Sequence, residues 1–99
     1  QIFTNIIHRD PGWPEAWNKR ATLLYLMNDF QRSLKDIDHT LKLEPRHFGA
    51  LSGRAQIYIK LEEYEKALDD LKKIKNIHPT SVGNEIIPEL EKFIKGLNI

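Results

Sequence analysis

Residues 13–45 read WPEAWNKRATLLYLMNDFQRSLKDIDHTLKLEP, and residues 46–79 repeat their pattern as RHFGALSGRAQIYIKLEEYEKALDDLKKIKNIHP. Pro11, Pro45 and Pro79 stand 34 residues apart. A fixed period of this size is typical of arrays in which each repeat is a pair of helices. The stretch 13–45 therefore predicts the architecture of the whole chain.

Within the first copy, apolar residues recur at helical spacing. Trp17, Ala21 and Leu24 follow an i, i+4, i+7 pattern, and Pro14 suits the first turn of the same helix. Asp29 can accept hydrogen bonds from the free N–H groups of the next helix, which stops before Pro45. The residues expected to widen the apolar stripe of the first helix are Leu23, Leu26 and Met27.

The two ends of the chain are also predicted to be helical. Residues 1–9 form one segment that Pro11 terminates. The last helix is expected to begin near Asn84–Ile86, because Pro88 is tolerated only in the first turn, and to end at Gly96. Short connections make neighbouring helices antiparallel, so we expect an all-α chain of about six helices.

The two copies resemble the tetratricopeptide repeat (TPR) family, whose motif is W-x2-L-G-x2-Y, then A-x3-F, then A and P. The motif positions in the first copy are Trp17, Arg20, Ala21, Leu24, Ser33, Ile37, Thr40 and Pro45. Those in the second copy are Leu51, Arg54, Ala55, Tyr58, Ala67, Leu71, Ile74 and Pro79. The resemblance implies a right-handed superhelix of antiparallel helix pairs, in which small residues let the helices of a pair approach closely.

Both copies depart from the family at the same position. Arg20 and Arg54 stand where the family motif has Leu. Because the two arginines share one register, we expect a shared role. The expected arrangement has their stems packed and their charged heads in solvent or beside a neighbouring carboxylate.

The repeat register divides the chain into four segments. Residues 1–11 correspond to the second half of a preceding repeat, residues 12–45 and 46–79 to full repeats, and residues 80–99 to a C-terminal capping helix. The chain is therefore expected to be a fragment of a longer array. The sequence around WNKRAT and EPRHFGALSG is also similar to that of uncharacterised bacterial TPR proteins.

Composition narrows the classes of partner. The chain has 99 residues, 15 basic and 14 acidic side chains, a net charge of +1 and no cysteine. With charges so nearly balanced, the protein has no strong positive potential to attract nucleic acid. No apolar run is long enough to span a bilayer as a helix. We expect neither a nucleic-acid nor a membrane partner. The start does not read as a signal peptide, and the lack of cysteine fits a reducing compartment, so a cytoplasmic location is the default expectation.

No group of residues predicts catalysis. There is no glycine-rich phosphate loop, Ser52 has no histidine base nearby in sequence, and Asp69-Asp70 is expected to be a solvated surface pair. No two histidines are spaced to bind a metal from one helix face. We expect no enzyme activity, no metal and no cofactor. The histidines are His8, His39, His47 and His78.

The resemblance places a binding groove on the first helix of each repeat. Neutral polar side chains there can hydrogen-bond a peptide backbone, and Tyr25 and Ile59 would add apolar anchors. We expect a protein or peptide partner in this groove. The alternative is that the groove residues bind no ligand within this segment. The groove residues are Glu15, Asn18, Thr22, Tyr25, Ser52, Gln56, Ile59 and Lys60, with Gly49 beside them.

Chaperone-binding TPR proteins hold a C-terminal carboxylate with Lys and Asn side chains at defined groove positions. The corresponding positions hold Asn18, Thr22 and Gly53, so that specificity is not expected here. Two alternative functions remain open. One is an accessory TPR segment of a larger enzyme. The other is self-assembly through an exposed apolar cluster of the first helix, formed by Phe3, Ile6 and Ile7.

Overall fold

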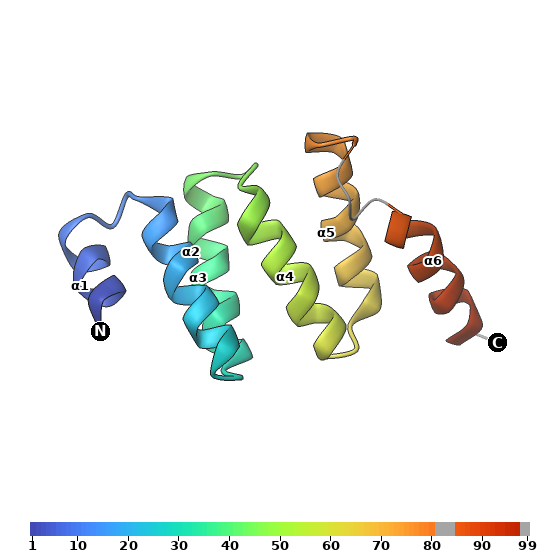
Figure 1. Ribbon diagram of the computed structural model, residues 1–99, viewed down its shortest axis with the longest axis horizontal. Helices are drawn as coiled ribbons and strands as arrows, with labels where there is room; N and C mark the ends of the chain where they lie inside the picture. The colour runs from blue at the N-terminus through green and yellow to red at the C-terminus, as the bar shows by residue number, and fades with distance from the viewer. Residues whose placement is uncertain (81–84, 98–99) are drawn as a thin grey trace.

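The computed structural model describes residues 1–80 and 85–97. Within these ranges it contains helices and no strand. The helices are α1 (Ile2–Arg9), α2 (Pro14–Leu26), α3 (Phe30–Leu43), α4 (Phe48–Lys60), α5 (Tyr64–Ile77) and α6 (Ile86–Leu97). They follow one another along the longest of three dimensions, 49 × 27 × 19 Å (Figure 1). The predicted all-α architecture is confirmed.

The predicted helix ends agree with the structure except at the C-terminus. Pro14 and Pro88 both lie in the first turn of their helices, where proline removes no hydrogen bond. Gly96 lies inside α6, so the prediction that it ends the helix is wrong. No described glycine has a positive φ, which is the conformation that a terminating glycine supplies. Asn84 lies outside the described residues.

None of the helices in residues 1–80 and 85–97 is long and apolar enough to cross a membrane.

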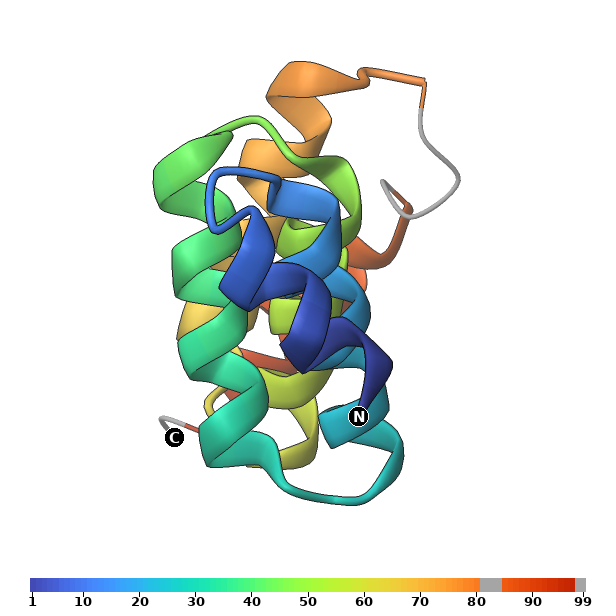
Figure 2. The same cartoon turned by 90° about the vertical axis from the view of Figure 1, so that its left-hand side faces the viewer.

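The closest packing is within the two helix pairs, α2 with α3 and α4 with α5. Figure 2 shows α2 and α3 side by side when the array is viewed from the α1 end. Small residues make this approach possible, because Ala21, Ser33, Ala55 and Ala67 are all buried. The Ser33 hydroxyl also donates to the Ala21 carbonyl oxygen at 2.7 Å. The small positions expected from the repeat motif are confirmed.

The two pairs turn in the same way. Asn28 and Glu62 have φ angles of 61° and 60°, in the left-handed region. The backbone makes the same two hydrogen bonds at both turns. In the turn between α4 and α5, the Glu63 N–H donates to the Tyr58 carbonyl at 2.8 Å and the Glu62 N–H donates to the Ile59 carbonyl at 3.0 Å. This bond pair is the Schellman motif, in which glycine is the preferred residue.

Glu62→Gly is therefore expected to stabilise the fold by about 0.5–1 kcal/mol, because a side chain in this conformation is strained. Asn28→Gly, one repeat earlier, should give a smaller gain, since asparagine tolerates a positive φ better than glutamate. Urea denaturation followed by circular dichroism measures both changes. A loss of stability in Glu62→Gly would contradict the assignment of strain to this turn.

Arg20 and Arg54 each make the same pair of hydrogen bonds to an aspartate of the following helix. The Nε and Nη2 atoms of Arg20 donate to Asp36 at 2.7 and 2.8 Å, and those of Arg54 donate to Asp70 at 2.9 and 2.8 Å. Asp36 and Asp70 are only 4% and 1% exposed. These hydrogen bonds raise the pKa of each arginine, although burial acts in the opposite direction. The heads thus reach a carboxylate, one of the two expected arrangements.

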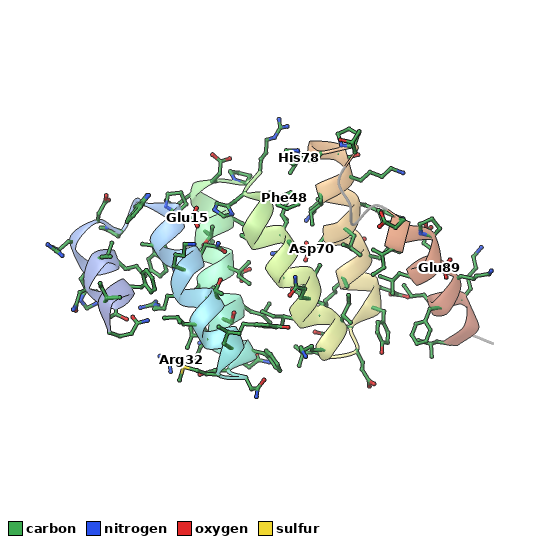
Figure 3. All side chains as sticks on the ribbon, in the orientation of Figure 1. Glu15, Arg32, Phe48, Asp70, His78 and Glu89 are labelled. Carbon is green, nitrogen blue, oxygen red and sulfur yellow. The ribbon has the colours of Figure 1, made fainter. Side chains whose placement is uncertain are left out.

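Each arginine also contacts the second helix of the preceding repeat, which is α1 for Arg20 and α3 for Arg54. Arg20 Nη1 donates to the Thr4 hydroxyl and Arg54 Nη1 donates to Asp38, both at 3.3 Å. One side chain in each repeat therefore joins three helices. The expectation that Asp70 is a solvated surface residue is wrong, because Asp70 lies between α4 and α5 (Figure 3).

The apolar stripe expected on α2 is also partly wrong, because Leu23, Leu26 and Met27 are exposed. Leu23 has the same register as Ile57, which is 0% exposed in a core cluster with Ala21 and Ile37 of the preceding pair. In the described residues only α1 precedes α2, whereas a helix pair precedes α4. The face of α2 that carries Leu23 is therefore covered less than the face of α4 that carries Ile57. Burial at this register depends on the neighbouring repeat.

The apolar cluster of α1 differs from the expectation in its exposure. Ile7 is only 4% exposed, and Phe3 and Ile6 are half-buried. Helix α1 packs on α2, which covers part of its apolar side. The expected exposed surface for self-assembly is therefore wrong at Ile7 and reduced at the other two residues.

Candidate functional site

A cleft with a volume of about 320 Å³ lies between α2 and α4. These helices are neighbours in the array (Figure 1), and residues of α3 form part of the cleft wall. The lining residues are Asn18, Ala21, Thr22, Tyr25 and Leu26 from α2, Ser33 and Ile37 from α3, and Phe48, Gly49, Ser52, Gly53, Gln56 and Ile57 from α4. Residues of both repeats therefore line the cleft.

Most of the groove residues expected from the sequence meet in this cleft. Asn18, Thr22, Tyr25, Ser52 and Gln56 all line it. The remaining three lie outside its lining. Ile59 is half-buried, Lys60 places its Nζ 6.0 Å from the centre of the Tyr25 ring, and Glu15 contacts Asn18 and His47.

Sequence reasoning did not place Phe48, Leu26 or Ile37 in the cleft. Phe48 begins α4 and is 40% exposed. It precedes Ser52 by four residues and Gln56 by eight, which is the spacing of one helix face. That spacing could have identified Phe48, whereas Ile37 reaches the cleft from the other helix of the pair.

One end of the cleft is fixed by a contact between the two repeats. His47 Nδ1 accepts a hydrogen bond from the Ala50 N–H at 3.0 Å and so caps the start of α4. Its Nε2 therefore carries the proton and donates to Glu15 at 3.2 Å. Glu15 and Phe48 mark this end of α2 and α4 in Figure 3.

The pKa of Glu15 reflects these contacts. Burial alone would raise it, but the hydrogen bonds from His47 and Asn18, together with electrostatic attraction to His47 and Lys19, outweigh burial and leave the pKa of Glu15 below its ordinary value. The carboxylate is thus held in its charged form at the rim. It is about two-fifths exposed, so solvent screens its effect on the cleft.

The two glycines of the cleft have different surroundings. A Cβ on Gly49 would lie 3.2 Å from His47 Cε1 and 3.3 Å from Asn18 Nδ2, which is tighter than ordinary contact. A Cβ on Gly53 would meet only Ile37 Cδ1, at an ordinary 3.8 Å. A side chain at residue 49 would therefore require His47 and Asn18 to shift by a few tenths of an ångström, whereas residue 53 leaves open space.

The cleft has no charged lining. No Asp, Glu, Lys, Arg or His is among its lining residues. Neutral polar groups of Asn18, Thr22, Ser52 and Gln56 lie beside apolar side chains, a combination typical of ligand-binding sites. In the part of the chain that the structure describes, no three His, Asp or Glu side chains are grouped as metal ligands.

No family model matches the chain. A TPR repeat-containing protein of Rhizobium etli is 46% identical over 66 residues, which cover 60% of this chain and 32% of that protein. The chain therefore spans about a third of the length of this relative.

Two solved structures have the same fold. The first TPR of Spaghetti (RPAP3), bound to the HSP90 peptide SRMEEVD, superposes with a TM-score of 0.86, at 18% identity, over 94% of this chain and 75% of that one. YrrB, described as a TPR protein with an unusual peptide-binding site, also has a TM-score of 0.86, at 22% identity, over 96% of this chain and 50% of that one. At these identities the likeness establishes the fold.

Proposed function

Because the chain has the tetratricopeptide-repeat fold and a TPR repeat-containing homologue, we propose that it is a non-catalytic protein–protein interaction module. In this proposal a peptide segment of the partner lies in the cleft between α2 and α4. The observation that carries the proposal is the cleft itself, which brings together polar residues of two repeats around an apolar floor.

The polar residues suit a peptide backbone. The side-chain amides of Asn18 and Gln56 each offer donors and an acceptor, so they can bond the N–H and C=O groups of an incoming chain. The Thr22 hydroxyl donates to the Asn18 carbonyl at 3.1 Å and retains its acceptor capacity. Because these groups come from both α2 and α4, a bound segment would span two repeats.

The peptide class differs from the one held by the first TPR of Spaghetti. That domain binds SRMEEVD, which carries several carboxylates. The cleft of this chain has no cationic lining residue to pair with them. We therefore expect SRMEEVD to bind this chain weakly or not at all, and isothermal calorimetry with that peptide serves as a comparison for the test below.

The test uses a peptide selected from a random display library against residues 1–99. Asn18→Ala combined with Gln56→Ala is expected to weaken its binding about tenfold or more. Each lost hydrogen bond contributes about 0.5–1.5 kcal/mol, and 1.4 kcal/mol corresponds to tenfold in the dissociation constant. Fluorescence anisotropy of the labelled peptide measures the dissociation constants.

The matched control is Gln31→Ala combined with Asn76→Ala. It removes one exposed amide from α3 and one from α5, the second helices of the two pairs. We expect this variant to bind as the unmodified chain does and both variants to keep their helical circular dichroism. Equal binding by the Asn18/Gln56 variant would refute the assignment of the peptide to this cleft.

The self-assembly alternative has less support. It relied on three exposed apolar residues of α1, and Ile7 is buried while Phe3 and Ile6 are half-buried. The peptide-binding proposal instead rests on a cleft that is open to solvent and contains most of the expected groove residues.

A further inference from the structure

We propose that Gly53 holds open an anchor pocket in the cleft, and that the bound peptide fills it with one large uncharged apolar side chain such as Leu, Met, Phe or Trp. This inference rests on the proposed function and adds the chemistry of the partner. It follows from what the fold requires of Gly53 and from the chemistry of the surrounding residues.

The backbone does not require glycine at residue 53. Gly53 lies in the interior of α4, and none of the described glycines has a positive φ. Glycine in a helix interior destabilises the helix relative to alanine, because it loses more conformational freedom on folding. The residue therefore lowers stability without supplying a special conformation.

Packing does not require it either. A Cβ at residue 53 would make one ordinary contact, 3.8 Å from Ile37 Cδ1. Gly49, one turn earlier, differs because a Cβ there would press on His47 and Asn18. What the absence of a side chain provides at residue 53 is space in the cleft.

The walls of that space select an apolar group. Ile37, Ile57, Tyr25 and Phe48 contribute apolar surface, and no lining residue could pair with a buried charge. An ionised anchor would lose its hydration without gaining a partner, whereas an apolar anchor gains by leaving water. The amides of Asn18 and Gln56 would hold the backbone on either side of the anchor.

The experiment first identifies the anchor in peptides selected from an unbiased library against residues 1–99. Alanine scanning of a selected peptide should find one Leu, Met, Phe or Trp whose removal weakens binding about tenfold or more, since each factor of ten reflects about 1.4 kcal/mol. No acidic or basic residue of the peptide, and not its C-terminal carboxylate, should have an effect of that size.

The second step closes the pocket from the protein side. Gly53→Leu is expected to weaken peptide binding about tenfold or more, and Gly53→Ala to weaken it less. Both variants should melt at a higher temperature than the unmodified chain, because they replace glycine in a helix interior. Gly53→Ala keeps the test valid should the larger side chain prevent folding.

Gly96→Leu is the matched control. Gly96 lies in α6, away from the cleft, and a Cβ there would have nothing within 4 Å. This variant should leave peptide binding unchanged. Binding of both Gly53 variants at full strength, or a charged residue as the strongest contact, would overturn the inference. If the Gly53 variants bind normally but the Asn18/Gln56 variant binds weakly, the anchor pocket is refuted and the proposed function still stands. If the Asn18/Gln56 variant also binds normally, both are refuted.

Discussion

Asp70→Ala is expected to lower the free energy of unfolding by about 3–5 kcal/mol, because the mostly buried Arg54 guanidinium loses its two short hydrogen bonds and keeps only the longer contact to Asp38. The two side chains are 2% and 17% exposed and are joined by two short hydrogen bonds. A domain of this size is stable by only about 5–15 kcal/mol. A large part of the Asp70→Ala protein should therefore be unfolded at moderate urea concentrations.

The adjacent residue provides the control. Asp69 is exposed, so Asp69→Ala should change stability by less than about 0.5 kcal/mol. Urea denaturation of the two variants measures the difference. The double change Arg54→Leu with Asp70→Leu should restore most of the lost stability, since apolar residues can replace a buried ion pair. Similar stabilities for Asp70→Ala and Asp69→Ala would show that the ion pair contributes little.

Ile57→Ala is expected to destabilise the chain by about 2–5 kcal/mol, the usual loss for a large core side chain. Ile57 is 0% exposed and packs with residues of the preceding pair. Leu23 has the same register one repeat earlier but is 37% exposed. Leu23→Ala should therefore have a clearly smaller effect, about 1 kcal/mol or less.

Urea denaturation of both alanine variants tests whether burial comes from stacking between repeats. The slope of stability against urea should stay the same in both, so the midpoints alone report the difference. Equal losses at Ile57 and Leu23 would mean that each helix pair buries its own residues and that the contact between pairs matters little.

Much of the fold could be predicted from local signals. Helix starts follow from Pro14 and Asp29, whose effects act within one turn, and the tight approach of paired helices follows from small residues such as Ala21 and Ala67. Exposure was harder to predict, because it depends on the helix next door. Leu23 and Ile57 have similar side chains and the same register, yet their neighbours differ.

The ion pairs show a signal that a reading of single helices misses. A carboxylate on a charged helix is usually solvated, so Asp70 was expected at the surface. The informative pattern joins two helices. Arg20 precedes Asp36 by 16 residues, Arg54 precedes Asp70 by the same distance, and the pattern recurs with the period of the repeat.

The polar residues of the candidate site could be predicted from the sequence, but the depth of the cleft could not. Asn18, Thr22, Ser52 and Gln56 follow from the register of the first helices. The depth of the cleft arises from what is missing at Gly53 and from Ile37, which reaches it from another helix. Empty space depends on three helices at once and leaves no periodic pattern in the sequence.

The most direct test of the central claim is a chemical-shift titration of the ¹⁵N-labelled chain with a selected peptide. We expect the largest changes at the amides of Asn18, Ser52, Gly53 and Gln56, which come from two helices and meet at one cleft. With Gly53→Leu, about ten times more peptide or more should be needed to reach the same changes. Shifts concentrated instead on the outer sides of α3 and α5, or on α6, would contradict the account.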